Sequence, residues 1–178
     1  VAANSYLATK ISFINAMAQM CQAAGGDVVL LADALGYDER IGREFLNAGL
    51  GFGGGCLPKD IAALAVRADE LGVTVLSDFI HSVEAINAGQ RTELAELAID
   101  QAGGDVVGKR IAVLGAAFKP GTDDTRNSPA LTVADQLHAS GADVRIYDPQ
   151  ARLPPREGFT QVASVEQAVL GADVVLHL

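Results

Sequence analysis

Cys56 is the residue of this 178-residue chain whose surroundings most favour nucleophilic chemistry. A cysteine reacts through its thiolate, which forms more readily beside a cation and at a helix N-terminus. Lys59 lies three residues further on, and Pro58 suits the first turn of a helix that runs to about Leu71. The three glycines before the cysteine allow a ligand to approach the backbone. The pattern predicts a reactive thiol before a helix, with a small buried cysteine beside a flexible loop as the simpler alternative.

Helical periodicity dominates the first hundred residues, which must position this cysteine. Apolar residues recur at helical spacing up to about Ala24, where two glycines end the pattern. Asp27 can cap a second helix, and Asp38 can cap a third, short one through Phe45. The expected helices cover residues 1–24, 28–36, 39–45, 58–71 and 77–101. The stretch NAGLGFGGGC, residues 47–56, holds five glycines and predicts the loop that leads into the cysteine.

Strands alternate with helices after the glycines at 103 and 104. KRIAVLG, residues 109–115, reads as a strand, and a helix is expected from about Ser128 to Gly141. ADVRIYDP, SVEQAVLG and ADVVLHL then read as strand, helix and strand. This alternation predicts a parallel, doubly wound sheet with right-handed crossovers. The expected fold is an all-helical domain over residues 1–103, followed by a partial Rossmann-like α/β domain over residues 104–178.

Composition and charge exclude several classes of protein. The chain is 49% hydrophobic and carries a formal charge of −9 with only 13 basic residues, so it can bury a core but offers no cationic surface for nucleic acid. No apolar run approaches the ~18 residues of a membrane span. Two cysteines are too few for a disulfide framework, which favours the reducing cytoplasm. Val1 opens within a helical pattern and Leu178 ends within an apolar run, so we expect both ends to be cuts in a longer protein.

Three segments together resemble the UDP-glucose and GDP-mannose dehydrogenase family. GFGGGCLPKD, residues 51–60, is similar to the family's cysteine motif across ten positions. AANSYLATKISFIN, residues 2–15, resembles the start of its long central helix, and VLGAAFKPGTDDTRNSP, residues 113–129, resembles the opening of its C-terminal domain. The resemblance covers essentially the whole chain. It implies the helical central domain and part of the UDP-sugar-binding C-terminal domain, without the N-terminal NAD domain.

The resemblance implies covalent catalysis of a double oxidation that uses two NAD and no metal. A first hydride transfer gives an aldehyde, the cysteine adds to form a thiohemiacetal, a second transfer gives a thioester, and water releases the carboxylate. On this basis Cys56 is the nucleophile, Asp60 helps to activate water or settle charge, and Asn4 donates to the developing oxyanion. The simpler alternatives are a first-turn acid that complements the helix dipole for Asp60 and a packing amide for Asn4.

The resemblance also assigns ligand contacts. It implies that Arg40 reaches the sugar of a neighbouring subunit, that Phe118 and Lys119 touch the nucleotide sugar, and that Lys59 and Arg126 serve the cofactor, with Arg126 at the NAD phosphates. The simpler alternatives are a solvated helix charge for Arg40 and surface pairing with Asp123 or Asp124 for Arg126. The backbone that wraps the sugar and phosphates is matched by Asn47, Ala48, Gly49, Leu50, Gly51, Phe52 and Gly53.

Some expected parts are missing from the 178 residues. The family's catalytic lysine falls one residue before Val1, and Lys10 lies too far along the helix from Asn4 to replace it. No G-x-G-x-x-G fingerprint follows the strand at 109–115. Asp148, before a proline, is more typical of a turn than of a ribose-binding acid. Three isolated histidines lack metal-ligand spacing, so no metal is expected.

The combined interpretation is a homodimeric part of a UDP-glucose-type dehydrogenase that is inactive alone. Apolar helical surface beyond what the helical domain can hide favours dimerisation through that domain. RIGREFLNAGLGFGG is similar to the UDP-glucose type of enzyme. GDP-mannose is the competing substrate, and UDP-N-acetylmannosamine ranks third. The alternative from another class is a non-catalytic nucleotide-sugar-binding or dimerisation module with a vestigial cysteine.

Overall fold

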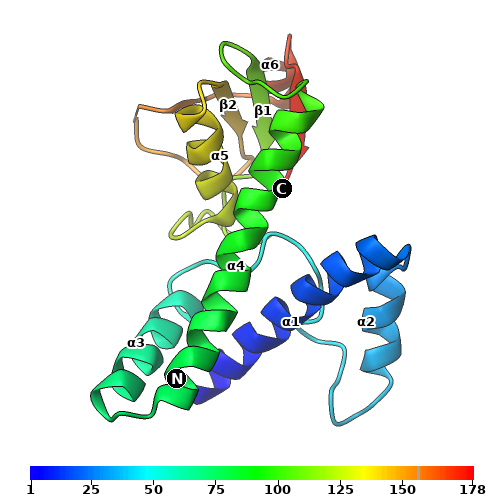
Figure 1. Cartoon of the computed structure of the whole chain (residues 1–178). Coiled ribbons are helices and arrows are strands. Elements are labelled where there is room, and N and C mark those ends of the chain that lie inside the picture. Colours follow the sequence, from blue (N-terminus) through cyan, green and yellow to red (C-terminus); the bar gives the residue numbers. More distant parts are fainter. Residues whose placement is uncertain (156) are drawn as a thin grey trace. The chain divides into compact units, whose positions relative to one another are not determined.

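The computed structural model describes residues 1–155 and 157–178, which form two compact units, Val1–Gln90 and Arg91–Leu178 (Figure 1). The first is helical, and the second is a parallel four-stranded sheet with helices, so the predicted fold class is confirmed. The two units divide within a long helix, whereas the sequence placed the boundary just after it, between residues 103 and 104. No described helix has the length and apolar character needed to cross a membrane.

Four helices make up the first unit and begin the second: α1 (Ala2–Ala24), α2 (Val28–Gly36), α3 (Leu57–Glu70) and α4 (Thr74–Gln101). Gly25 ends α1 in the left-handed conformation, which only glycine adopts at little cost. Asp27 caps α2 by accepting hydrogen bonds from two backbone N–H groups. Four of the five helices expected in the first hundred residues are therefore present, and α4 begins three residues earlier than expected.

The expected short helix over residues 39–45 is wrong. The backbone N–H groups of Ile41 and Gly42 both donate to the carbonyl of Asp38, which closes a single turn. Gly42 and Phe45 then adopt positive φ angles of 68° and 64°, which a right-handed helix cannot accommodate. The segment between α2 and α3 is consequently an ordered loop whose shape depends on contacts with other elements.

Two apolar clusters hold the first unit together. One joins α1, α3, α4 and the glycine-rich loop through Ala8, Phe52, Ile61, Ala65, Ile80 and Val83. The other joins α1, α2 and the same loop through Ile14, Ala32 and Leu46. Burial of such side chains stabilises by roughly 25 cal/mol per Å² of apolar surface. Because Phe52 and Leu46 belong to these clusters, the segment between α2 and α3 is packed into the core at two points, one within the glycine-rich loop and one just before it.

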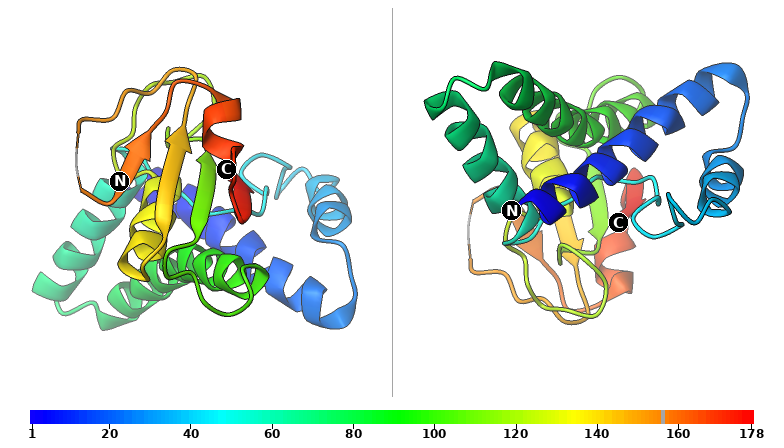
Figure 2. Two further views of the ribbon diagram at one scale, coloured as in Figure 1. Left: turned by 90° about the horizontal axis from the view of Figure 1, so that it is seen from above. Right: turned by 90° about the horizontal axis from the view of Figure 1, so that it is seen from below.

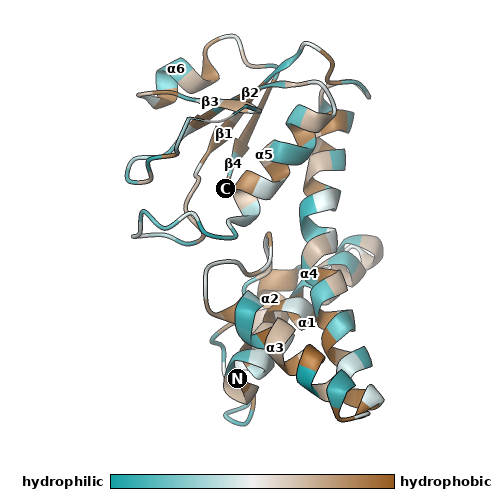
Figure 3. Cartoon of the chain, turned by 90° about the vertical axis from the view of Figure 1, so that its left-hand side faces the viewer, coloured by the Kyte–Doolittle hydropathy of each residue, from teal (hydrophilic) through white to brown (hydrophobic). Residues whose placement is uncertain are grey.

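The second unit is built on β1 (Arg110–Leu114), α5 (Pro129–Ala139), β2 (Asp143–Tyr147), β3 (Phe159–Gln161), α6 (Val165–Val169) and β4 (Val174–His177). The strands run parallel in the order β3-β2-β1-β4, with Val113 opposite Ile146 and Leu176 (Figure 2). Figure 3 shows the hydrophobic residues along β1. The central strand β1 is almost continuously apolar, as expected for a strand of a parallel sheet covered on both faces.

The sequence did not predict β3. It has only three residues, Phe159, Thr160 and Gln161, and none of them is buried. Its place is fixed by pairing with β2, where the N–H of Val162 also donates to the carbonyl of Ile146. A strand this short lacks a readable periodicity, so only the tertiary pairing reveals it.

Candidate active site

Cys56 occupies the N-cap position of α3. Its side chain makes no capping hydrogen bond, and the residue is exposed. Pro58 lies in the first turn, and the N–H of Asp60 donates to the Cys56 carbonyl at 3.0 Å, so the helix begins at the cysteine. The partial positive charge of a helix N-terminus therefore lies next to the thiol. Cys56 therefore lies before a helix, as predicted, and it is exposed rather than buried.

Asp60 and Asn4 meet directly. The Asn4 Nδ2 donates to Asp60 Oδ2 at 2.7 Å, which links the first turn of α1 to the first turn of α3. Lys59 Nζ lies 3.7 Å from Asp60 Oδ1. The Asn4 hydrogen bond, together with nearby positive charge that includes Lys59, holds the pKa of Asp60 below its ordinary value. Because Asp60 follows Cys56 by four helical positions, both lie on one side of the helix start.

The glycine-rich loop is fixed by two asparagines from α1 and α4. Asn15 Oδ1 accepts from the N–H of Gly49 at 2.8 Å. Asn87 Oδ1 accepts from the N–H of Phe52 at 2.7 Å, and Asn87 Nδ2 donates to the Phe52 carbonyl at 3.1 Å. Gly53 and Gly54 are buried after Phe52, whereas Asn47, Ala48 and Gly49 are exposed. The loop therefore presents one exposed end on a firmly held base.

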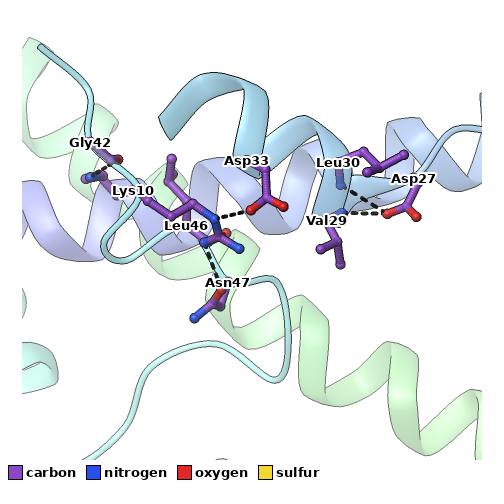
Figure 4. A network of polar contacts seen from close by, with 9 residues as sticks. Lys10, Asp27, Val29, Leu30, Asp33, Gly42, Leu46 and Asn47 are labelled. Carbon is purple, nitrogen blue, oxygen red and sulfur yellow. Dashed lines mark hydrogen bonds and ion pairs between the residues drawn. The ribbon is translucent and has the colours of Figure 1, made fainter. Parts of the chain in front are cut away.

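Charged side chains hold the segment before this loop (Figure 4). Lys10 Nζ donates to the carbonyls of Ile41 and Gly42 at 2.9 and 3.1 Å. Arg43 bonds the Asp33 carboxylate at 2.7 Å and Asn47 Oδ1 at 2.8 Å. Lys10 is thus a structural residue, in keeping with its rejection as a catalytic substitute. Sequence reasoning missed Asn15 and Asn87 because their partners lie 34 and 35 residues away, and it missed Arg43, which lies in a segment that was expected to be a helix and bonds residues just after it.

Arg40 is almost fully exposed and pairs with Asp38. Its backbone N–H, Nε and Nη2 all donate to that carboxylate, at 3.0, 2.9 and 2.6 Å. The hydrogen bonds from Arg40 hold the pKa of Asp38 below its ordinary value. The guanidinium fork uses Nε and Nη2 in this pairing, which leaves the outward edge of Nη1 and Nη2 facing away from Asp38.

Arg126, in the second unit, repeats this pairing with Asp124. Its backbone N–H donates to Asp124 Oδ1 at 2.9 Å, and Nη2 lies 2.6 Å from Oδ2. These hydrogen bonds lower the pKa of Asp124 to about 2. The alternative of surface pairing with Asp124 is therefore present in the structure. Such a pair orients the guanidinium.

Phe118 and Lys119 lie on the loop that follows β1. The N–H of Phe118 donates to the Asp124 carbonyl at 3.0 Å, and Lys119 Nζ lies 5.5 Å from the centroid of the Phe118 ring. Asp148, at the end of β2, accepts from the N–H groups of Ala116 and Ala117 and from those of two residues after itself. The bonds to the two following residues are those of a turn, as predicted, and the bonds to Ala116 and Ala117 also tie Asp148 to the loop after β1.

Across residues 1–155 and 157–178, no group of three or more His, Cys, Asp or Glu side chains could hold a metal ion. The candidate reactive side chains of the first unit gather at the start of α3. Cys56, Lys59 and Asp60 are near neighbours in sequence there, and Asn4 joins them through its hydrogen bond to Asp60. A thiol with an adjacent carboxylate and an amide donor can perform acyl-type covalent chemistry.

Comparison with known proteins defines the class. The central domain of the UDP-glucose/GDP-mannose dehydrogenase family matches residues 1–89, and the UDP binding domain of the same family matches residues 112–178. The chain therefore belongs to the UDP-glucose/GDP-mannose dehydrogenase family. These two matches follow the helical unit and most of the sheet unit.

Individual relatives support the same membership. The UDP-glucose 6-dehydrogenase YwqF of Bacillus subtilis is 42% identical over 99% of this chain, which spans 40% of that relative's length. A UDP-glucose dehydrogenase structure from Pyrobaculum islandicum superposes with a TM-score of 0.91 at 34% identity, covering 99% of this chain and 41% of that one. The structure of a UDP-D-ManNAc dehydrogenase from Pyrococcus horikoshii superposes with a TM-score of 0.80 at 33% sequence identity, covering 98% of this chain and 39% of that one.

Proposed function

We propose that these residues form the central and UDP-sugar-binding parts of an NAD-dependent dehydrogenase that oxidises UDP-glucose to UDP-glucuronate. The observation that carries the proposal is the start of α3, where an exposed cysteine precedes an aspartate hydrogen-bonded to Asn4. The names and close superposition of UDP-glucose dehydrogenases support this sugar over GDP-mannose. The exposed Cys56 speaks against a vestigial cysteine in an inert module.

Cys56 is the covalent nucleophile of this proposal. Its thiolate adds to the carbon of the aldehyde formed by the first oxidation, and the carbonyl oxygen takes up the negative charge and then a proton. The second oxidation converts this thiohemiacetal to a thioester, which water cleaves to release the carboxylate and the thiol. The helix N-terminus favours the thiolate and can stabilise negative charge that develops beside it.

Asn4 and Asp60 assist the same centre. A carboxamide has two N–H donors, and Asp60 takes one, so the other can donate to the developing oxyanion. The Asn4 bond also orients the Asp60 carboxylate, which can then accept a proton from the water attacking the thioester. Each residue thereby combines a structural contact with a chemical role.

The loop over residues 47–53, with its exposed N-terminal end, offers backbone groups to the sugar and phosphates. Arg40 offers an outward-facing cation that we assign to the sugar of a neighbouring subunit. Phe118 and Lys119 offer an aromatic ring and an exposed ammonium for the nucleotide sugar. These residue types match a diphosphate flanked by a sugar and a base.

Lys59 and Arg126 fit an anionic dinucleotide. Their side chains are 74% and 75% exposed, so both can approach phosphate oxygens without breaking a core contact. Bound NAD supplies the oxidising capacity for both steps. Arg126 holds its fork against Asp124, and its exposed guanidinium has the planar geometry that suits a phosphate.

A homodimer in the cytoplasm completes the proposal. Tyr6, Phe13 and Met20 are exposed and recur every seven residues along α1, so they form an apolar stripe on one helix face. A second copy of the chain could cover this stripe by isologous packing. Both cysteines are free, which suits a reducing compartment.

Calorimetric titration with UDP-glucose, GDP-mannose and NAD in parallel tests the proposal. We expect UDP-glucose to bind and GDP-mannose to bind at least tenfold more weakly. Preference for GDP-mannose would reverse the substrate assignment, and no binding to the folded chain would contradict a UDP-sugar site within these residues. Because the resemblance places the NAD domain and the catalytic lysine outside them, we expect no NAD reduction by these 178 residues alone.

A further inference from the structure

The Asn87 side chain pairs with the backbone of the glycine-rich loop in the way that a neighbouring β-strand would. Its carboxamide accepts from the Phe52 N–H and donates to the Phe52 carbonyl, so both backbone polar groups of one loop residue are paired with one side chain. Asn87 and Phe52 are only 6% and 5% exposed. Hydrogen bonds inside a core are shielded from competing water, and an unpaired partner there is costly. This contact fixes the base of the loop four residues before Cys56.

Gly51 shows how closely the loop approaches this side chain. A Cβ on Gly51 would lie 2.0 Å from Asn87 Oδ1, and the residue has a φ of +87°. Only glycine satisfies both conditions. The close approach is therefore a specific fit between Asn87 and the loop rather than a loose contact.

Asn15 makes the second attachment from α1. It is fully buried and accepts from the Gly49 N–H, while its Nδ2 has no hydrogen-bond partner among the described residues. The attachment at Asn15 is therefore a single bond beside an unsatisfied donor, whereas that at Asn87 is a complete pair. An unsatisfied buried donor carries a desolvation cost, which reduces the net stabilisation that Asn15 contributes.

We propose that Asn87 and Asn15 are positioning residues that hold the 47–53 loop in its sugar-binding shape, with Asn87 dominant. This role rests on the proposed function, because it assigns the loop backbone to the sugar and phosphates. Both side chains are buried, so they act through the loop backbone that they bond. Their effect is to remove, before binding, the conformational freedom that an unanchored glycine-rich loop would lose on binding.

Amide hydrogen exchange tests the anchoring without any ligand. In Asn87→Ala we expect the amides of residues 49–54 to exchange at least tenfold faster, with a smaller increase in Asn15→Ala. Ser12→Ala is the matched control, because the Ser12 hydroxyl makes a 2.8 Å buried bond to the Val83 carbonyl, between the same two helices but without a hydrogen bond to the loop. It should lower Tm without a selective change in the loop. Equal loop exchange in Asn87→Ala and Ser12→Ala would overturn the proposal.

Asn87→Asp adds a readout that a purely structural role would not give. Its carboxylate keeps the acceptor for the Phe52 N–H but repels the Phe52 carbonyl, whereas the protonated carboxyl restores the donor. Loop protection in this variant should therefore rise towards wild type as pH is lowered from 8 to 5, a rise absent from Asn87→Ala. A pH response identical to that of Asn87→Ala would contradict the assigned bonds.

Calorimetry with UDP-glucose then tests the link to binding. We expect a Kd about tenfold weaker for Asn87→Ala and little changed for Ser12→Ala, measured below the Tm of each variant. Unchanged affinity in Asn87→Ala would limit the two asparagines to folding and overturn their role in binding. If wild type binds no UDP-glucose, the proposed function fails, and the exchange experiment still decides whether the asparagines anchor the loop.

Discussion

The Asn4 side chain donates a 2.7 Å hydrogen bond to the Asp60 carboxylate, across 56 positions of sequence. The bond ties the helix that carries Asn4 to the helix that starts at Cys56. It orients the carboxylate of Asp60 and lowers its pKa, while the amide keeps a second N–H donor. The chemistry proposed for Cys56 depends on this pairing.

Asn4→Ala should raise the pKa of Asp60 towards its ordinary value of 3.8. The folded-state pKa of Asp60 is depressed, so its contribution to stability is present above the unfolded pKa and is lost as pH falls through the folded pKa. The variant should lose part of that contribution near neutral pH, and its free energy of unfolding should fall less steeply as the pH is lowered. Carboxyl NMR titration measures the pKa, and an unshifted Asp60 would contradict the account.

Arg126→Ala should raise the pKa of Asp124 from about 2 part of the way to its ordinary value, because the backbone N–H at position 126 still donates. The stability that Asp124 contributes is present above about pH 4 and is lost as pH falls through about 2. Carboxyl NMR again provides the measurement. Arg40→Ala is the control, since it should raise the pKa of Asp38 and leave the pKa of Asp124 unchanged.

Gly51→Ala should destabilise the chain by more than about 2 kcal/mol, since the added methyl meets Asn87 and the backbone is left-handed. Gly49→Ala, in the same loop, is the matched control. A Cβ there meets nothing within 4 Å, so its effect should stay within about 0.5 kcal/mol. Urea unfolding of both variants gives the comparison, and similar losses would contradict the described loop conformation.

Phe13→Asp should convert a dimer to a monomer. Phe13 is the middle residue of the exposed α1 stripe, and a carboxylate in an apolar interface has no partner. Light scattering gives the mass of each species. Val66→Asp, at an exposed apolar position on α3, is the control and should stay dimeric. A monomeric wild-type chain would remove the stripe as a dimer interface.

Local patterns predicted most of the secondary structure and the position of Cys56 before a helix. Glycine, proline and capping aspartates act within a few residues, so α1, α2, α3 and α5 could be read directly. The expected helix from Asp38 to Phe45 failed because Lys10 and Arg43 hold that segment as a loop. The three-residue β3 was invisible without its partner strand.

The resemblance supplied Asn4 and Asp60 as candidates, but only the fold shows that they are bonded. Asn15 and Asn87 were missed because an asparagine on a helix gives no sequence signal for a partner that lies 34 or 35 residues away. Long-range polar contacts of this kind depend on tertiary packing and require a structure.

Alkylation of Cys56 by iodoacetamide, measured against Cys21 by peptide mass spectrometry, tests the central claim most directly. Cys21 lies on α1 in the same chain and reports any general change in reagent or fold. The account predicts faster labelling at Cys56 than at Cys21, and selective protection of Cys56 by UDP-glucose but not by equal GDP-mannose. Equal labelling of the two thiols, with no protection by UDP-glucose, would contradict the assignment of Cys56 as the nucleophile of a UDP-sugar site.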